Sequence, residues 1–483
     1  MESFRGKRFL TFNNSPSTTF ILSQPPSLFM PKSHEDKGTL KPLRSKDSRF
    51  FSTHLPPVQG VVVVDSPRDS LDLEGELDGF GVTQDHLSGD GSGEEAPPTS
   101  FKKKAFQTTR QPLVDLKERK NGCDRYGFIL QDASQPVSAS TALAKIQRLD
   151  SEAPIMRNEE DRRLVIDNYL FKKGLSIDSL VKTKDFKMMV RHGIPADYRA
   201  RFWWQLSGAS TIFEEGYYER LLKKYEGRSS LAIQQIELDV HRTLPFNVNF
   251  CNTDAPGIPK LRRILVAYSW RNPLVGYCQG MNLLVACLLL VLDEVEAFWV
   301  FSCIMERIMP EDYYTSNLVV SQADQRVLKE LATEKFPKLL RHLESFGVDL
   351  MLITFNWFLT IYVDSFPPET LFRVWDCFLY EGPKVLFRFA MGILKMHERH
   401  ILQLEGSSAI FNYLKTMTCK VFEAEELVKC AFQGLNPFPS KSIFPKRNLY
   451  VIQLQEEAKE VEEQRLALDA TLRKQRAASV REL

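Results

Sequence analysis

Apolar residues recur at every third or fourth position through most of the chain from about residue 140 onward, which is the spacing of a buried helix face. This periodicity predicts helices over residues 141–149, 158–172, 217–225, 231–240, 258–270, 294–308, 323–331, 336–346, 351–363 and 385–404. Strict alternation of apolar and polar residues, the pattern of a strand, is nearly absent from the same region. The pattern therefore predicts an all-α, multi-helix domain of roughly 250 residues.

Prolines and aromatic residues add local detail to this pattern. Pro195 suits the first turn of a helix, and we expect that helix to carry Trp203 into the core and to stop at Gly208. Residues 367–368, both proline, begin a further helix that runs through residue 376. Upstream, residues 124–128 (DRYGF) are expected to form a compact aromatic turn.

Composition divides the chain into four parts. Residues 1–120 are dominated by Ser, Pro, Gly, Thr and charged side chains, and such a segment buries too little apolar surface to offset its ordering entropy. We therefore predict a disordered N-terminal region there. Residues 121–184 form a helical lead-in, residues 185–445 the main helical domain, and residues 446–483 a charged helix.

The charged C-terminal helix carries apolar residues at alternating three- and four-residue steps, as in a short coiled coil. The seam consists of Val451, Leu454, Ala458, Val461, Leu468 and Leu472. Arg465 and Gln475 interrupt it. Two outcomes remain open, namely a homodimer formed through this helix and a helix that folds back on its own domain.

One stretch in the middle of the chain combines a core segment with a polar opening. Residues 283–292 are apolar at every position, so they belong in the core. The preceding residues 276–282 (GYCQGMN) place Gln279 between two glycines where the buried helix begins, and this arrangement presents its amide outward. Arg242 stands 37 residues earlier, in the segment IELDVHRTLP. An arginine and a glutamine on separate loops, both braced by apolar helices, could act together on a phosphate group.

Charge and cysteine content exclude several classes of function. The net charge is +2 and no basic patch is interleaved with aromatic residues, so we expect no nucleic-acid partner. The eight cysteines form no CxxC pair and have no histidine at zinc-ligand spacing, which predicts neither a metal site nor disulfides. The longest apolar run has ten residues, too short to span a bilayer of ~30 Å. These features predict a soluble, cytoplasmic protein.

Four motifs in a fixed order carry a family resemblance. They are Gly193-Ile194-Pro195 with Arg199 and Trp203, then Ile236-x-x-Asp239-x-x-Arg242-Thr243, then Gly276-Tyr277-Cys278-Gln279-Gly280-Met281-Asn282, then Arg373-Val374-Trp375-Asp376. Together they resemble the TBC domain, the all-helical catalytic module of GTPase-activating proteins for Rab GTPases. The resemblance covers about residues 187–404.

A narrower likeness extends over residues 267–272, 309–314, 354–358 and 436–438. These segments resemble the Armus-like subgroup of TBC proteins, which act on the late-endosomal Rab. The likeness implies a GTP-bound Rab as partner and peripheral association with endosomal or other vesicle membranes through partners. The PH domain and long coiled coil that precede the TBC domain in that subgroup have no counterpart in this sequence.

The resemblance also implies roles for individual residues. Arg242 matches the family's arginine finger and Gln279 its glutamine finger, which orients the attacking water. The Rab brings GTP and Mg²⁺, so the chain needs no cofactor of its own. Supporting or GTPase-contacting roles fall to Asp239, Thr243, Tyr277, Cys278, Gly280 and Asn282. A catalytically silent scaffold that binds a Rab as an effector or adaptor is the alternative function.

Local structural interpretations stand beside these roles. Arg242 can form an (i, i+3) surface salt bridge with Asp239, and Gln279 can bond backbone amides at the helix start. The remaining motif residues are expected to be structural: Gly193, Pro195, Arg199, Trp203, Arg373, Trp375 and Asp376. Arg373 and Asp376 lie one helical turn apart, and we expect a buried ion pair between them to orient their helix.

Overall fold

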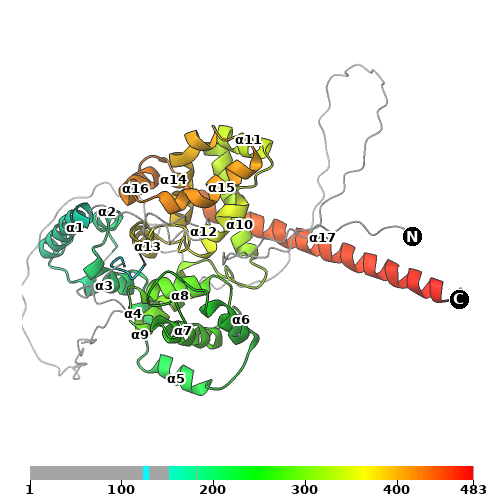
Figure 1. Ribbon diagram of the computed structural model, residues 1–483, viewed down its shortest axis with the longest axis horizontal. Coiled ribbons are helices and arrows are strands. Elements are labelled where there is room, and N and C mark those ends of the chain that lie inside the picture. Colours follow the sequence, from blue (N-terminus) through cyan, green and yellow to red (C-terminus); the bar gives the residue numbers. More distant parts are fainter. Residues whose placement is uncertain (1–122, 130–151, 181, 482–483) are drawn as a thin grey trace, which may run out of the picture. The chain divides into compact units, whose positions relative to one another are not determined.

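The computed structural model of the chain describes residues 123–129, 152–180 and 182–481 (Figure 1). The predicted disordered region over residues 1–120 and the predicted helix over residues 141–149 lie outside these ranges. The described part is built from α-helices and contains no β-strand, with isolated bridges at Cys123–Ile129 and Phe128–Asn247. The predicted all-α fold is confirmed.

The helices follow one another along the chain in this order. The first five are α1 (Glu152–Lys173), α2 (Lys184–His192), α3 (Ala196–Leu206), α4 (Ala209–Ile212) and α5 (Tyr217–Lys224). The next four are α6 (Leu231–Val240), α7 (Gly257–Arg271), α8 (Met281–Leu289) and α9 (Glu294–Cys303). Then come α10 (Val319–Lys335), α11 (Pro337–Ser345), α12 (Met351–Leu359), α13 (Pro368–Glu381) and α14 (Lys384–Ile401). The last are α15 (Ser407–Met417), α16 (Ala424–Phe432) and α17 (Ser440–Arg481).

Helix α8 contains most of the central apolar segment of the sequence, and α6, α7 and α9 pack against it (Figure 1). Helix α8 is buried along its whole length, which explains why its sequence is apolar on every side. Helix α7 packs against α6, α8 and α9. Ser230 starts α6 because its side-chain oxygen accepts a hydrogen bond from the backbone N–H of Ile233 at 3.2 Å. The predicted boundaries of α6, residues 231–240, are those observed.

Two predicted helices end earlier than their apolar pattern does. Helix α9 gives way to a π-helical turn, Ile304–Ile308. Helix α12 stops at Leu359, and the next residues include Ile361 and Tyr362 with positive φ of 47° and 64°. Both side chains are fully buried, and the Tyr362 hydroxyl donates to the Leu386 carbonyl at 2.8 Å. Tertiary packing therefore overrides the local helical pattern there.

A buried polar centre on Asp376 joins α3 to α13. The Arg199 guanidinium donates from Nε to Asp376 Oδ1 at 3.1 Å, and the Trp203 indole N–H donates to the same oxygen at 2.8 Å. The backbone N–H of Ile194 donates to Oδ2 at 3.3 Å. The Trp203 and Trp375 rings stack at 5.4 Å between centroids. These motif residues lie in the core of the domain, where they hold helices together.

The expected ion pair between Arg373 and Asp376 is wrong. Asp376 pairs with Arg199, whereas Arg373 donates to Glu425 Oε1 at 3.1 Å and to the Arg191 carbonyl at 2.6 Å. Gly193 makes this arrangement possible, since a Cβ there would lie 2.2 Å from Arg373 Nη1. Each residue is structural and buried, but the partners come from other helices.

The first turns of α17 fold back on α10 (Figure 1). Arg447 donates from Nε to Asp324 Oδ1 at 2.6 Å, and both side chains are buried. Further along α17, Glu457 forms a salt bridge with Arg326 of α10. Beyond that pair the described side chains are exposed, Val461, Leu468 and Leu472 among them. The part of α17 up to Glu457 therefore packs against its own domain, as the fold-back alternative expected. A homodimer through the part beyond Glu457 stays a prediction.

None of the described helices combines the length and the apolar character needed to cross a membrane.

Candidate functional site

Arg242 lies two residues beyond the end of α6 and is held by a carboxylate of the same helix. Its Nε and Nη2 donate to Asp239 Oδ1 at 2.9 and 2.6 Å, while Nη1 takes no part in this pair. The Arg242 side chain remains 43% exposed, whereas that of Asp239 is 6% exposed. The predicted (i, i+3) salt bridge is therefore formed, and it holds the guanidinium at the surface.

A closed set of hydrogen bonds connects this arginine-bearing loop to the start of α8. The Tyr277 hydroxyl donates to Asp239 Oδ2 at 2.5 Å and lies 3.2 Å from Asn282 Oδ1. The Asn282 amide donates to Thr243 Oγ1 at 2.8 Å, and that hydroxyl donates to the Asp239 carbonyl at 2.7 Å. The loops of Arg242 and Gln279, far apart in sequence, are thereby fixed to each other.

Gln279 precedes the residue that starts α8. Gly280 occupies the N-cap position with φ of 104°, and its N–H donates to Asn282 Oδ1 at 3.2 Å. The backbone N–H of Cys278 contacts Met281 Sδ at 3.3 Å. The carbonyls of Cys278 and Gly280 accept further backbone hydrogen bonds at the helix start. Within the described residues the half-buried Gln279 side chain makes no hydrogen bond.

The electrostatic environment keeps the neighbouring side chains neutral. Burial, reinforced by the Asp239 carboxylate, raises the pKa of the Tyr277 phenol far above its usual value. The same two causes raise the pKa of the Cys278 thiol to about 12. A thiol with such a pKa is protonated at neutral pH and is a poor nucleophile. The chemistry available to this site is therefore charge and hydrogen bonding from Arg242 and Gln279.

The structure brings one group of the predicted site residues together and keeps another apart. The group around Arg242 and Gln279 comprises Asp239, Thr243, Tyr277, Cys278, Gly280 and Asn282. The structural group gathers around Asp376 and Arg373 instead. Sequence reasoning missed three residues that support these groups, namely Tyr126, Asn247 and Glu425. The aromatic turn predicted at residues 124–128 pointed to Tyr126. Its partners Arg199 and Asn247 lie far away in the sequence, so no local pattern indicated them.

Comparisons with known proteins agree with the motifs. Residues 196–402 match the family model of the Rab-GTPase-TBC domain. TBC1 domain family member 2B of Xenopus tropicalis is 41% identical over 346 residues, which is 70% of this chain and 36% of that protein. TBC1 domain family member 2A of Homo sapiens is 41% identical over 343 residues, with the same two coverages. The chain thus spans about a third of the length of these relatives.

A solved structure extends the agreement to the fold. The crystal structure of the Chlamydomonas flagellar RabGAP TBC domain matches with a TM-score of 0.53 and 28% sequence identity. The match covers 64% of this chain and 98% of that domain. The relatives 2A and 2B are Armus-like proteins, the subgroup that the sequence motifs indicated. Residues 196–402 of the chain therefore carry a TBC domain.

Proposed function

We propose that this chain accelerates GTP hydrolysis by a Rab-family GTPase and inserts Arg242 and Gln279 into the active site of that GTPase. The observation that carries the proposal is the exposed Arg242 guanidinium, held by Asp239 on a loop that is bonded to the loop of Gln279. Both side chains stand on loops that buried hydrogen bonds lock together. A phosphate-bearing partner would meet them as one preformed surface.

Hydrolysis by small GTPases is slow because charge on the phosphoryl oxygens is poorly compensated in the transition state. An arginine supplied in trans is worth roughly 10³–10⁵ in rate. The planar guanidinium can bond two phosphate oxygens at once, which a lysine ammonium does not do. The Gln279 amide can both donate to and accept from the attacking water. The GTP and the Mg²⁺ come with the GTPase, so this chain contributes side chains only.

The salt bridge with Asp239 does not oppose this use of Arg242. The Arg242 side chain is 43% exposed, whereas that of Asp239 is 6% exposed. Moving the guanidinium from Asp239 to a phosphate keeps the arginine paired with an anion, and the Tyr277 hydroxyl still donates to the buried carboxylate that it leaves. Asp239 itself stays bonded to Tyr277, so the loop keeps its position when the arginine leaves. The carboxylate acts as a cradle that orients the guanidinium before the GTPase arrives.

The late-endosomal Rab is the substrate that we propose first, on the basis of the Armus-like motifs and of the relatives 2A and 2B. Such a substrate would bring the chain to endosomal membranes as a peripheral protein. Direct measurement of GTP hydrolysis decides among the Rabs.

Single-turnover GTP hydrolysis by a panel of GTP-loaded Rabs tests the proposal. We expect acceleration of at least one Rab, the late-endosomal Rab first, and loss of that acceleration in the Arg242→Ala variant. Binding to a GTP-loaded Rab is measured in parallel. Tight binding with no acceleration across the panel would contradict the proposal and support the scaffold alternative.

A further inference from the structure

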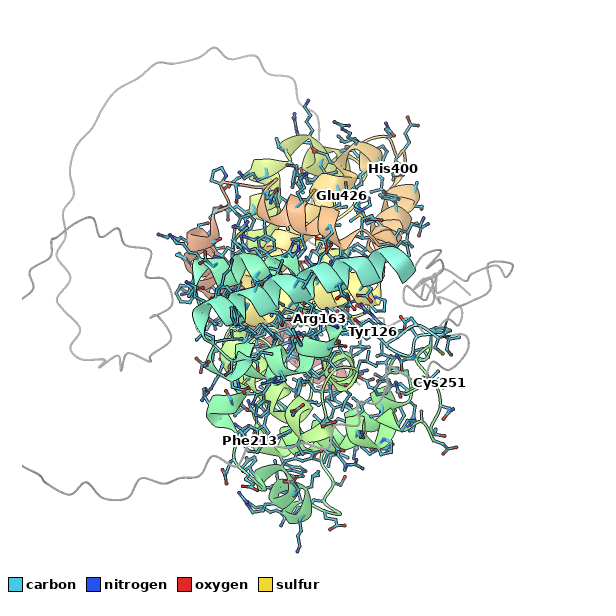
Figure 2. All side chains as sticks on the ribbon, turned by 90° about the vertical axis from the view of Figure 1, so that its left-hand side faces the viewer. Tyr126, Arg163, Phe213, Cys251, His400 and Glu426 are labelled. Carbon is cyan, nitrogen blue, oxygen red and sulfur yellow. The ribbon has the colours of Figure 1, made fainter. Side chains whose placement is uncertain are left out.

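A short turn far upstream of the TBC match is built into the domain core. Residues 123–129 precede the matched range 196–402, and both Tyr126 and Phe128 are buried, with 5% and 2% exposure. The Asp124 side chain shapes the turn because its Oδ1 accepts the backbone N–H groups of Tyr126 and Phe128 at 2.9 and 2.8 Å. Tyr126, labelled in Figure 2, packs against Phe372, and their ring centroids are 4.4 Å apart.

The turn is bonded directly to the chain that follows Arg242. The N–H of Ile129 donates to the Phe246 carbonyl at 2.8 Å, and the N–H of Val248 donates to the Gly127 carbonyl at 2.9 Å. The Asn247 side-chain amide donates to the Tyr126 carbonyl at 2.8 Å. Asn247 is completely buried. Three hydrogen bonds therefore fix residues 246–248 to a segment about 120 positions earlier in the sequence.

The loop that carries Arg242 is consequently fixed at both ends. On the near side, Thr243 and Asp239 are tied to the start of α8 through Asn282 and Tyr277. On the far side, residues 246–248 are tied to the turn at residues 123–129. Between the two anchors Leu244 has a positive φ of 43° although its side chain is buried. A non-glycine residue keeps such a conformation only when its surroundings impose it.

We propose that the turn at residues 123–129 is a positioning element for the arginine-bearing loop of the GTPase-activating site. This inference rests on the proposed function and deepens it, because it places part of the working site in the region before the TBC match. A displacement of about 1 Å in a group that acts on a transition state can cost about 10²-fold in rate. We expect displacements of this size when the hydrogen bonds between residues 246–248 and the turn are lost. The turn therefore contributes to the position of the Arg242 guanidinium.

The same turn connects the arginine-bearing loop to the core. The Tyr126 hydroxyl accepts a hydrogen bond from Arg199 Nη1 at 2.9 Å, and Arg199 belongs to the Asp376 centre. Arg125 pairs with Glu159 of α1 and with Glu369 of α13. The turn is therefore itself held rigidly, which is the property that an anchor needs.

Gly127 offers a direct test in the full-length chain. Its φ is 84°, and a Cβ there would lie 3.0 Å from Val248 Cγ2 and 3.1 Å from Asn249 Nδ2. A side chain at this position therefore pushes against the residues that the turn anchors. Gly174 is the matched control because it also has a positive φ, 59°, but a Cβ there meets no atom within 4 Å.

The experiment compares Gly127→Val with Gly174→Val in two measurements. The first is the kinetics of GTP hydrolysis by the most responsive Rab at varied concentrations of the chain. The second is hydrogen exchange at residues 244–250. For Gly127→Val we expect a fall in kcat of about 10-fold or more, a KM within about twofold of wild type, and faster exchange at the Val248 amide. For Gly174→Val we expect wild-type values of all three quantities.

If Gly127→Val does not fold, the milder pair Gly127→Ala and Gly174→Ala replaces the valine variants. We again expect a lower kcat and faster Val248 exchange in the Gly127 variant than in the Gly174 variant. Unchanged kcat in a folded Gly127 variant whose Val248 amide exchanges faster would overturn the positioning role, because the loop would then be loosened without consequence. Wild-type exchange at the Val248 amide together with wild-type kcat, in both Gly127→Val and Gly127→Ala, would also overturn the positioning role. If the wild-type chain accelerates no Rab, the proposed function fails and the positioning role falls with it. Acceleration by wild type and Gly127→Val alike removes the positioning role only.

Discussion

Two arginine–aspartate pairs in this molecule have similar chemistry and opposite surroundings. Arg199 is bonded to Asp376 with its side chain 2% exposed, and Arg242 is bonded to Asp239 with its side chain 43% exposed. Arg199 uses all three guanidinium nitrogens, on Asp376, on the Tyr126 hydroxyl and on the Ile194 carbonyl. Arg242 uses two nitrogens on a single oxygen.

The difference separates a pair that serves the fold from the pair that we propose for the reaction. A buried pair whose donors are all satisfied cannot exchange partners without leaving a charge unpaired in the core, which is costly. A half-exposed pair can exchange its carboxylate for a phosphate oxygen while water covers the remaining donors. Asp239 is itself buried and bonded to Tyr277, so the flexible member of that pair is the arginine.

The largest expected effect comes from the exposed arginine. Arg242→Ala should lower Rab GTP hydrolysis by roughly 10³-fold or more, because an arginine supplied in trans is worth that much. Its thermal stability should stay closer to wild type than that of a buried-arginine variant, since the Arg242 side chain is 43% exposed and Asp239 keeps its hydrogen bond from Tyr277. Arg242→Lys should recover little, because the two-pronged geometry is lost. Single-turnover kinetics measure the activity, and a melting curve measures the thermal stability. Near-full activity of the lysine variant would mean that Arg242 contributes only its positive charge.

The buried arginine should give the converse result. Arg199→Ala leaves Asp376 uncompensated in the core and should lower the free energy of unfolding by about 3–5 kcal/mol. Chemical denaturation of the variant beside Arg242→Ala measures the contrast. If the two variants unfold at the same denaturant concentration, burial does not distinguish the two pairs.

Gln279 sharpens the comparison because it belongs to the exposed site and makes no side-chain bond within the described residues. Gln279→Ala should lower the hydrolysis rate by about 10²-fold, the magnitude found when one hydrogen-bonding group is removed from a transition state. Its melting temperature should not change. Gln455→Ala, at an exposed position of α17, is the control for both measurements. A clear loss of thermal stability in Gln279→Ala alone would assign the residue to the structure.

The smallest effect concerns the turn that contacts both regions. Burial raises the pKa of Asp124 from its usual 3.8 to about 6, although two backbone N–H groups favour the charged form. The folded state therefore binds this proton more tightly than the unfolded state. The corresponding stability is complete below about pH 4 and is lost as the pH rises through about 6.

Asp124→Asn retains the oxygen that accepts both N–H groups and removes the charge. The variant should be more stable than wild type above pH 6, by about 1–3 kcal/mol, and should lose this advantage near pH 4. Unfolding of the full chain at several pH values between 4 and 8 measures the difference. A constant difference across this range would mean that Asp124 does not titrate in it.

Local patterns in the sequence predicted the helical class, most helix positions and the motif residues. Periodicity within ten or fifteen residues is enough to place a helix such as α6, whose boundaries matched, because the information is local. The residues around Arg242 and Gln279 were also identifiable, since they lie in two compact motifs. Helices α2, α4, α15 and α16 were not predicted individually, and α12 ended before its apolar pattern did.

Tertiary structure alone decided the long-range partners. Spacing placed Arg373 one turn from Asp376, yet Arg373 bonds Glu425 and Asp376 bonds Arg199, because three packed helices converge there. No local pattern links residues 123–129 to residues 246–248, which meet through backbone hydrogen bonds that carry no side-chain signature. Backbone pairing between distant segments depends on how the helices pack, and that packing is a property of the whole core.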